Sequence, residues 1–254
     1  MLRFFRQIRK NLMEQNKTQK YLLYALGEIL LVVLGILIAL QIDTWNESKK
    51  QQKASRDFIT RLQKEVRINI EYAKSQMETE EAQIHAARTI LRFFNNPGQE
   101  GIRSDLDSLI YVILSNNTLE IVSGTLNEGF NTGNIAIIAP DSLRSALYNL
   151  PSLIEKIRKQ EEIDREDVNG HFTQFLYYNY NYRNMDNRFS PYKGVIGPTR
   201  FTEYDNLSLL DSQAFENMVD NRYWNCMEQL KRLQEINAAL LRIEATIEKV
   251  LADG

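Results

Sequence analysis

Two histidines are the side chains best suited to hold a metal ion or to move a proton. His85 follows Glu81 by four residues, and His171 follows Asp167 by four residues. If the two helices packed at the same height, these side chains could form a metal site, but the di-metal pattern of helical bundles is Glu-x-x-His. Residues four apart on a helix also pair simply on a solvated face. We therefore predict no metal and no other cofactor.

Motifs of nucleotide binding and of hydrolysis are absent from the sequence. There is no GxxxxGK[ST], GxGxxG, GxSxG, HExxH or CxxC. The one cysteine, Cys226, falls on an apolar helical face, which indicates a buried structural thiol. Lys and Arg number 31 against 33 Asp and Glu, a balance that argues against nucleic-acid binding. We predict a protein that is not an enzyme and binds no nucleic acid.

Residues 177–204 hold six of the 12 tyrosines of the chain, with arginines interleaved, and most of them lie in a predicted loop at 179–210. Tyr and Arg are enriched at binding hot spots because they combine large contact area with directional hydrogen bonds. Either the rings bind a partner, as long loops often do, or they fill the distal end of the fold. The candidate partner-binding residues are Tyr180, Tyr182, Arg183, Arg188, Tyr192 and Tyr204.

The strongest local pattern is an apolar segment at residues 21–42, with 14 Leu, Ile or Val residues and one charged residue, Glu28. About 20 apolar residues span the ~30 Å hydrocarbon core of a bilayer, and the aliphatic side chains outweigh the insertion cost of one acid. The segment is longer than the apolar region of a signal peptide, and no A-x-A-like site follows it. We predict an uncleaved signal anchor that crosses the membrane once.

The tail before this segment predicts the orientation of the protein. Residues 1–20 carry six Lys or Arg against one Glu, a net charge of +5, with apolar residues at helical spacing. Such a tail is typical of an amphipathic helix on an anionic cytoplasmic surface. We expect the N-terminus in the cytoplasm and residues 43–254 on the opposite side of the membrane.

Glu28 is an acid at a depth where ionisable residues usually face protein. Gly27, Gly35 and Ala39 share a neighbouring helical stripe, and small residues at this spacing let helices approach closely. These four residues are the predicted transmembrane packing face. Glu28 then contacts another transmembrane helix, from a partner or from a second copy of the chain; the other interpretation is a protonated acid tolerated in lipid.

The first 48 residues contain a series of short motifs: FFR and IR at residues 4–9, YLLYA at 21–25, GEI at 27–29, GILIALQI at 35–42 and WNE at 45–47. In this order they resemble the N-terminal signature of an uncharacterised single-pass membrane-protein family of the Bacteroidota. Gly133-Asn134 before Ile135 resembles a turn of the family, whereas Gly129 and Phe130 depart from its pattern. The resemblance implies a Gram-negative inner-membrane protein with a periplasmic domain, and it implies no activity.

Three long segments after the anchor show helical periodicity, at residues 48–95, 141–175 and 211–251. The last has a near-heptad, coiled-coil-like seam. Helices with such narrow apolar stripes must pack together. We predict an all-α protein in which the transmembrane helix continues into an elongated antiparallel bundle of about four helices.

These features predict a membrane-anchored, non-enzymatic helical bundle in the bacterial envelope. Its expected partners are the lipid bilayer and other membrane or periplasmic proteins, including a second copy of the chain. An alternative is a periplasmic ligand-sensing bundle that binds a small molecule near the polar layer of Glu161 and Asp164 and signals laterally through a partner's transmembrane helix. A polar pocket between helices would favour the alternative; a filled core with an exposed aromatic end would favour protein binding.

Overall fold

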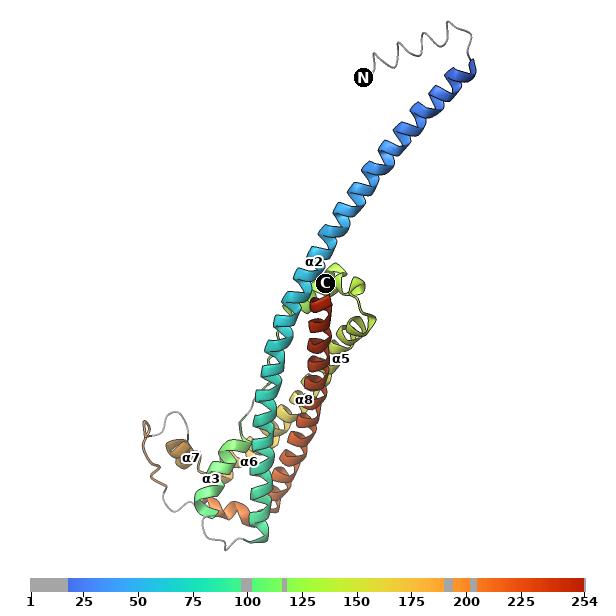
Figure 1. The fold of residues 1–254 in the computed structure, drawn as a ribbon. Coiled ribbons are helices and arrows are strands. Elements are labelled where there is room, and N and C mark those ends of the chain that lie inside the picture. Colours follow the sequence, from blue (N-terminus) through green and yellow to red (C-terminus); the bar gives the residue numbers. More distant parts are fainter. Residues whose placement is uncertain (1–17, 97–101, 116–117, 190–193, 202–204, 254) are drawn as a thin grey trace. The chain divides into compact units, whose positions relative to one another are not determined.

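The computed structural model describes residues 18–96, 102–115, 118–189, 194–201 and 205–253, and these are helical without any strand (Figure 1). The predicted all-α class is therefore confirmed for the described residues. The elements in chain order are α2 (Thr18–Asn95), α3 (Ile102–Ile113), α4 (Gly124–Thr132), the 3-10 helix η1 (Asn134–Ile137), α5 (Asp141–Asp167), the π-helix η2 (Val168–Phe172), α6 (Thr173–Asn179), α7 (Tyr182–Phe189), the 3-10 helix η3 (Asn206–Asp211) and α8 (Gln213–Asp253).

The chain divides into two compact units, residues 1–57 and 58–254, and α2 contributes to both. In the first unit, α2 contains the predicted apolar segment, and it is the one helix among the described residues that is long and apolar enough to cross a membrane. Trp45 follows this segment, and the ammonium group of Lys49 lies over the Trp45 ring, 4.0 Å from the ring centroid. The predicted basic tail lies outside the described residues except at its end.

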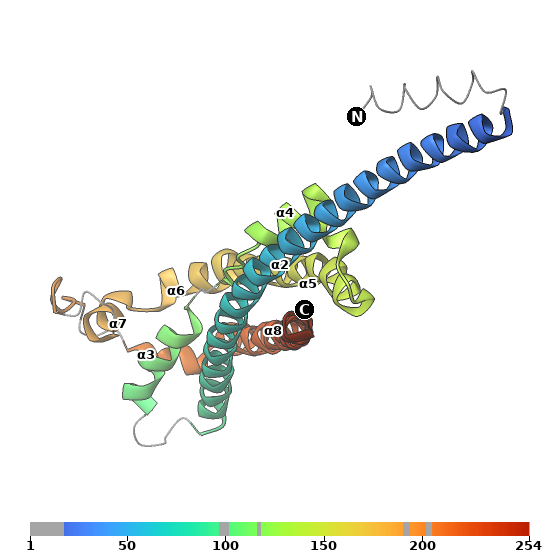
Figure 2. The same cartoon turned by 45° about the horizontal axis from the view of Figure 1, so that its top comes forward.

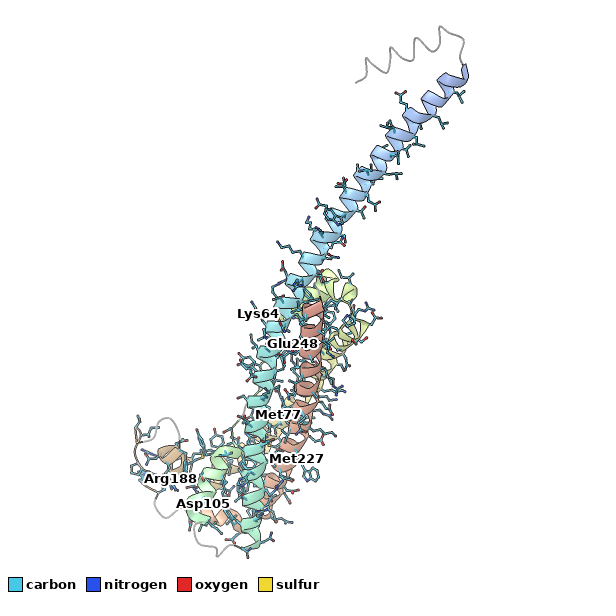
Figure 3. All side chains as sticks on the ribbon, in the orientation of Figure 1. Lys64, Met77, Asp105, Arg188, Met227 and Glu248 are labelled. Carbon is cyan, nitrogen blue, oxygen red and sulfur yellow. The ribbon has the colours of Figure 1, made fainter. Side chains whose placement is uncertain are left out.

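In the second unit, α2, α5 and α8 share a first apolar core. Phe58 and Leu62 of α2, Leu147 of α5 and Leu240 of α8 are fully buried members of it. Helices α2 and α8 run antiparallel. Figure 3 labels residues of the two helices at two heights. Lys64 of α2 is near Glu248 of α8 at one height, and Met77 of α2 is near Met227 of α8 at the other. In the predicted seam of α8, Leu230 and Val250 are half-buried and the other residues are buried, namely Cys226, Leu233, Ile236, Leu240, Ile243 and Ile247.

Residues 118–132 return along α2 and are held by two buried side chains of that helix. Asn69 bonds both backbone groups of Val122, donating to the carbonyl at 2.7 Å and accepting from the N–H at 2.8 Å. The Glu65 carboxylate accepts from the backbone N–H groups of Thr125 and Leu126 at 2.6 and 3.0 Å. These N–H groups belong to the first turn of α4 and have no partner inside the helix, so Glu65 caps it.

A second apolar core joins the end of α2 to α3, α6, α7, η3 and the start of α8. Figures 1 and 2 both show α7 beside α3, and α3 beside α2. The members of this core without exposed surface are Ala87, Ile90, Ile110, Leu176, Phe215 and Val219.

The segment 179–210, predicted as a loop, contains α7 and η3. In α7, Met185 is buried, and Tyr182 and Phe189 pack against the second core. This stripe covers only two turns, which is too short for a helical period to stand out in the sequence. The prediction of a loop is wrong for these two elements.

Two glycines in helical backbone provide a test of how α4 packs. A Cβ atom on Gly129 would lie 2.5 Å from Cζ of Phe58 and 2.8 Å from Cγ1 of Ile135, whereas a Cβ on Gly170 would meet no described atom within 4 Å beyond its own helix backbone. We expect Gly129→Ala to destabilise the full-length chain by about 1–3 kcal/mol through overpacking. Gly170→Ala should be neutral or stabilise by up to about 1 kcal/mol through helix propensity. Thermal unfolding in detergent, followed by circular dichroism, measures both, and equal melting temperatures for the two variants would contradict this packing.

Candidate binding site

A layer of buried polar side chains lies between the two apolar cores of the second unit, and Arg222 of α8 is at its centre. Arg222 has 2% of its surface exposed. Its Nε donates to the backbone carbonyl of Ile113 at 3.0 Å, its Nη2 donates to Oε1 of Gln83 at 2.6 Å, and its Nη1 donates to Asp164. These acceptors come from α3, α2 and α5, so one guanidinium connects α8 to three other segments.

Gln83 extends this network to the end of α3. Its Nε2 donates to the backbone carbonyl of Ser115, and its Oε1 accepts from Sγ of Cys226 at 3.3 Å as well as from Arg222. Cys226 is free and buried, as predicted, and burial raises the pKa of its thiol. The thiol is therefore a structural group at neutral pH.

Glu80 is the second acid of this layer, with 5% of its surface exposed. Its Oε1 accepts from Nε2 of Gln76 at 3.1 Å. Burial raises the pKa of Glu80 to about 7; the positive charge of Arg222 acts against this rise and the negative charge of Asp164 adds to it. Glu80 therefore changes protonation close to neutral pH.

A cavity of about 610 Å³, which we call the aromatic groove, opens between α3, η2, α6 and α7. The rings of Tyr177 and Tyr182 lie 5.5 Å apart there, and Tyr177 has 70% of its surface exposed. The hydroxyl of Tyr182 is buried and makes no hydrogen bond to any described residue, and burial raises its pKa to about 12. The groove is lined by Tyr111, Leu114, Ser115, Val168, Asn169, Thr173, Tyr177, Tyr182, Met185 and Asp186.

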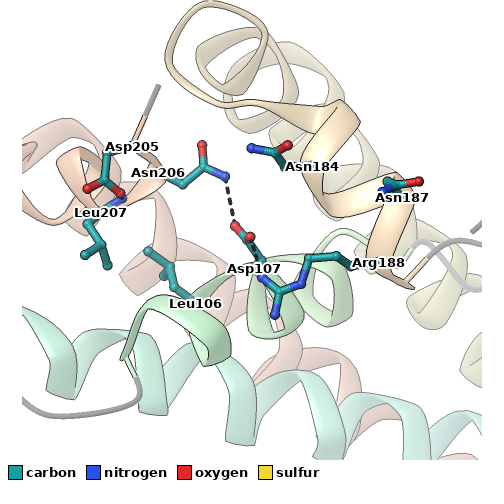
Figure 4. A pocket seen from close by; sticks show the side chains of 8 residues that line it. All are labelled: Leu106, Asp107, Asn184, Asn187, Arg188, Asp205, Asn206 and Leu207. Atoms are coloured by element: carbon teal, nitrogen blue, oxygen red, sulfur yellow. Dashed lines mark hydrogen bonds and ion pairs between the residues drawn. The ribbon is translucent and has the colours of Figure 1, made fainter. Parts of the chain in front are cut away.

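A second, smaller cavity of about 250 Å³ lies between α3, α7 and the start of η3, and we call it the Asp107 cavity. Figure 4 shows Asn206 and Asn184 on either side of the Asp107 carboxylate, with Arg188 below them. Most of the side chains around the space are polar. They are Leu106, Asp107, Asn184, Asn187, Arg188, Asp205, Asn206 and Leu207.

The structure separates the candidate partner-binding residues. Tyr182 lines the aromatic groove, whereas Tyr180 is buried and its hydroxyl donates to Oδ1 of Asp107 at 2.9 Å. Tyr180 therefore has no exposed face for a partner, because the second core and Asp107 take up its ring and its hydroxyl. Arg188 donates to Asp107 at 3.1 Å, and Arg183 donates to the carbonyls of residues 196 and 197. Tyr192 and Tyr204 lie outside the described residues.

The predicted transmembrane packing residues Gly27, Glu28, Gly35 and Ala39 all lie in the first unit on α2. Apart from the neighbouring backbone of α2 itself, no described atom lies within 4 Å of the position that a Cβ of Gly27 or Gly35 would take. Among the residues that the structure describes, no group of three or more His, Cys, Asp or Glu is placed to hold a metal ion.

Arg222 and Asp107 are not among the predicted site residues, although the sequence contains a signal for the first. Buried positions of α8 follow steps of three and four from Phe215 through Val219, Arg222, Cys226 and Gln229 to Leu233. A charged residue at such a seam position indicates a specific polar contact. Asp107 has no such signal, because its partners on α7 and η3 are remote in sequence.

In the part of the chain that the structure describes, fold and site define a helical protein with one candidate membrane-spanning helix, a buried polar layer, and an aromatic groove and an Asp107 cavity on two faces of α7. A model for a family of unknown function (DUF6090) matches residues 28–166, more than half of the chain, and the chain belongs to this family. No match was found among curated proteins or among solved structures. The matched range includes Glu80, Gln83, Asp107 and Asp164 and ends before α6, α7 and α8.

The raised pKa of Glu80 predicts a pH dependence of stability. Between the unfolded pKa of 4.5 and the folded value of about 7, the folded state holds a proton that the unfolded state releases. The contribution of Glu80 therefore lowers the free energy of unfolding by about 3 kcal/mol as the pH rises from about 5 to 8. Burial also raises the pKa of Glu161 and Asp167, so both contribute in the same direction.

We expect Glu80→Gln to flatten this dependence and to stabilise the chain most at pH 8. Glu81→Gln, a change at the next and exposed position, is the matched control and should unfold like the wild type. Melting curves of the full-length chain in detergent at pH 5 to 8 measure the difference. A wild-type stability that rises over this range, or parallel curves for wild type and Glu80→Gln, would show that the carboxyl is not protonated at neutral pH.

Proposed function

We propose that this protein is a non-enzymatic, membrane-anchored helical protein that engages other proteins of the bacterial envelope through its aromatic groove. The observation that carries the proposal is the groove itself, in which exposed and half-buried tyrosines meet hydrogen-bonding side chains. Rigid aromatic rings beside polar groups are the composition of protein-binding hot spots.

The anchor in this proposal is the apolar part of α2, placed in the inner membrane of a Bacteroidota cell. The length and composition of the helix support a single membrane crossing. The net charge of +5 over residues 1–20 supports a cytoplasmic N-terminus, with the bulk of the chain in the periplasm. Gly27, Glu28, Gly35 and Ala39 then offer a face for another transmembrane helix, from a partner or a second copy.

The second unit serves in this proposal as an antiparallel bundle of about four helical segments. Arg67 of α2 pairs with Glu244 of α8 at 2.7 Å, while Gln83 of α2 meets Arg222 of α8, so the two helices run in opposite directions. Asn69 bonds to Val122 on the path from α3 to α4, and Asp164 of α5 bonds to Arg222. These contacts support an arrangement in which four segments of the chain run alongside one another: α2, α5, α8 and the path from α3 to α4.

The groove fits a protein segment better than a small apolar molecule. Its walls offer the side chains of Asn169, Thr173 and Asp186 alongside the rings. A wholly apolar occupant would leave these polar groups without partners, which costs free energy. A peptide supplies both apolar side chains and backbone hydrogen-bonding groups.

Photo-crosslinking in the cells that carry the protein tests this proposal. We replace Tyr177, at the groove, with a benzophenone amino acid, and in a matched control we replace Tyr148, an exposed tyrosine of α5 that packs on Phe130. Ultraviolet light should convert the protein with the probe at 177 into an adduct of one defined mass containing a peptide of a second protein. The probe at 148 should not give that adduct. Equal adducts from both positions, or none at 177, would contradict binding at the groove.

A ligand-sensing bundle that signals laterally through a partner's transmembrane helix is the second candidate function. The observation in its favour is the polar layer of Arg222, Asp164 and Glu80, which divides the two apolar cores. Replacing well-packed apolar residues by buried charges is often unfavourable for stability. The buried charges would therefore be explained by a change of conformation on ligand binding. In the present structure, side chains and backbone groups of the chain itself occupy the hydrogen-bonding positions around Arg222.

A further inference from the structure

Helix α7 presents two faces to two different cavities. Tyr182, Met185 and Asp186 line the aromatic groove, and Asn184, Asn187 and Arg188 line the Asp107 cavity. Both sets have the spacing i, i+3, i+4 of a helix face. The two cavities have no lining residue in common, so a substitution in the wall of one leaves every residue that lines the other unchanged.

The floor of the Asp107 cavity is a fixed carboxylate. Asp107 has 6% of its surface exposed, and it accepts hydrogen bonds from the Tyr180 hydroxyl at 2.9 Å, from Nδ2 of Asn206 at 2.8 Å and from Nη1 of Arg188 at 3.1 Å. The donors come from the residue after α6, from η3 and from α7. Charge-assisted hydrogen bonds of this kind hold the carboxylate in one orientation.

Other polar groups around the cavity are not used by these bonds. Among the described residues, Arg188 donates to Asp107 through Nη1, and its Nε and Nη2 make no further hydrogen bond. Asn187 accepts from the N–H of Gly194 through Oδ1 at 3.2 Å, which leaves its Nδ2. The side-chain amide of Asn184 makes no hydrogen bond within the described residues and faces the cavity in Figure 4. The space therefore offers several donors and at least one acceptor.

The charges of the lining constrain what can bind. The Asp107 carboxylate and the Arg188 guanidinium compensate each other's charge, and the Asp205 carboxylate accepts from the N–H of Leu207 at 3.0 Å. A charged ligand would therefore have to compete with these contacts for its counter-charge. An apolar ligand would strip water from six polar side chains without replacing their hydrogen bonds.

We infer that the Asp107 cavity binds a neutral ligand with several adjacent hydroxyl groups, as in a sugar. A hydroxyl both donates and accepts, and the side-chain amides of Asn184 and Asn187 do the same. Asp107 and Arg188 supply a fixed acceptor and a fixed donor beside them. The same hydroxyl chemistry occurs in a free monosaccharide and in the terminal unit of a glycan chain.

Calorimetric titration of the full-length chain tests this inference, in a detergent whose headgroup is not a sugar. The probes are glucose, galactose, mannose and N-acetylglucosamine, each also as a short oligosaccharide. We expect saturable binding of at least one probe. Binding of the monosaccharide as tight as that of its oligosaccharide would identify a free sugar, and at least tenfold tighter binding of the oligosaccharide would identify a glycan end. Failure of all eight probes to bind the wild type would overturn the inference.

Two variants and one control assign binding to the cavity. Asn184→Ala should weaken the affinity at least tenfold, and Asn187→Ala gives a second reading if the first variant does not fold. Asn217→Ala changes an exposed asparagine on α8 and should leave the affinity unchanged. Equal affinities for the control and for a folded cavity variant would show that the sugar binds elsewhere. Crosslinking at Tyr177 does not depend on this result, so the two proposals fail separately.

Discussion

The buried guanidinium of Arg222 is the interaction on which the second unit depends. Moving a charge out of water costs several kcal/mol, and only well-placed partners offset that cost. Arg222 finds three such partners, and each lies on a different segment: Gln83 on α2, the Ile113 carbonyl on α3 and Asp164 on α5. The penalty for an unpaired charge therefore selects the arrangement in which all four segments meet at one level.

Both candidate cavities depend on the same layer. Arg222 and Gln83 bond the carbonyls of Ile113 and Ser115, which fixes the end of α3. Helix α3 carries Asp107, at the floor of one cavity, and Tyr111, in the wall of the other. Asp107 then holds α7 through Arg188. A disturbance at Arg222 would thus reach the two cavities through hydrogen bonds and packed side chains.

The helical class and the long helices can be predicted because burial of one stripe leaves a period of three to four residues. The seam of α8 is such a case, since its apolar residues recur over many turns. The sequence also marks Tyr182 as a candidate, through the local excess of tyrosine, and the structure places it in the aromatic groove. Local pattern is sufficient for these features.

The remaining features depend on contacts between remote residues. Tyr180 has the sequence context of a surface residue, but Asp107, 73 positions earlier in the chain, provides a buried acceptor for its hydroxyl. Asp164 interrupts an apolar stripe in the sequence, and the cation that compensates it lies on α8. Neither pairing has a local signal, because tertiary packing alone brings the partners together.

Hydrogen–deuterium exchange on the full-length chain in detergent, comparing Arg222→Met with the wild type, is the most direct test of the role of Arg222. Arg242→Met, an exposed change on the same helix, is the control. The account predicts faster exchange in residues 102–115 and 168–189, which form the cavity walls, with residues 233–247 of the first core unchanged. Unchanged exchange in the walls, or the same acceleration over the whole second unit, would contradict the claim that Arg222 orders these sites.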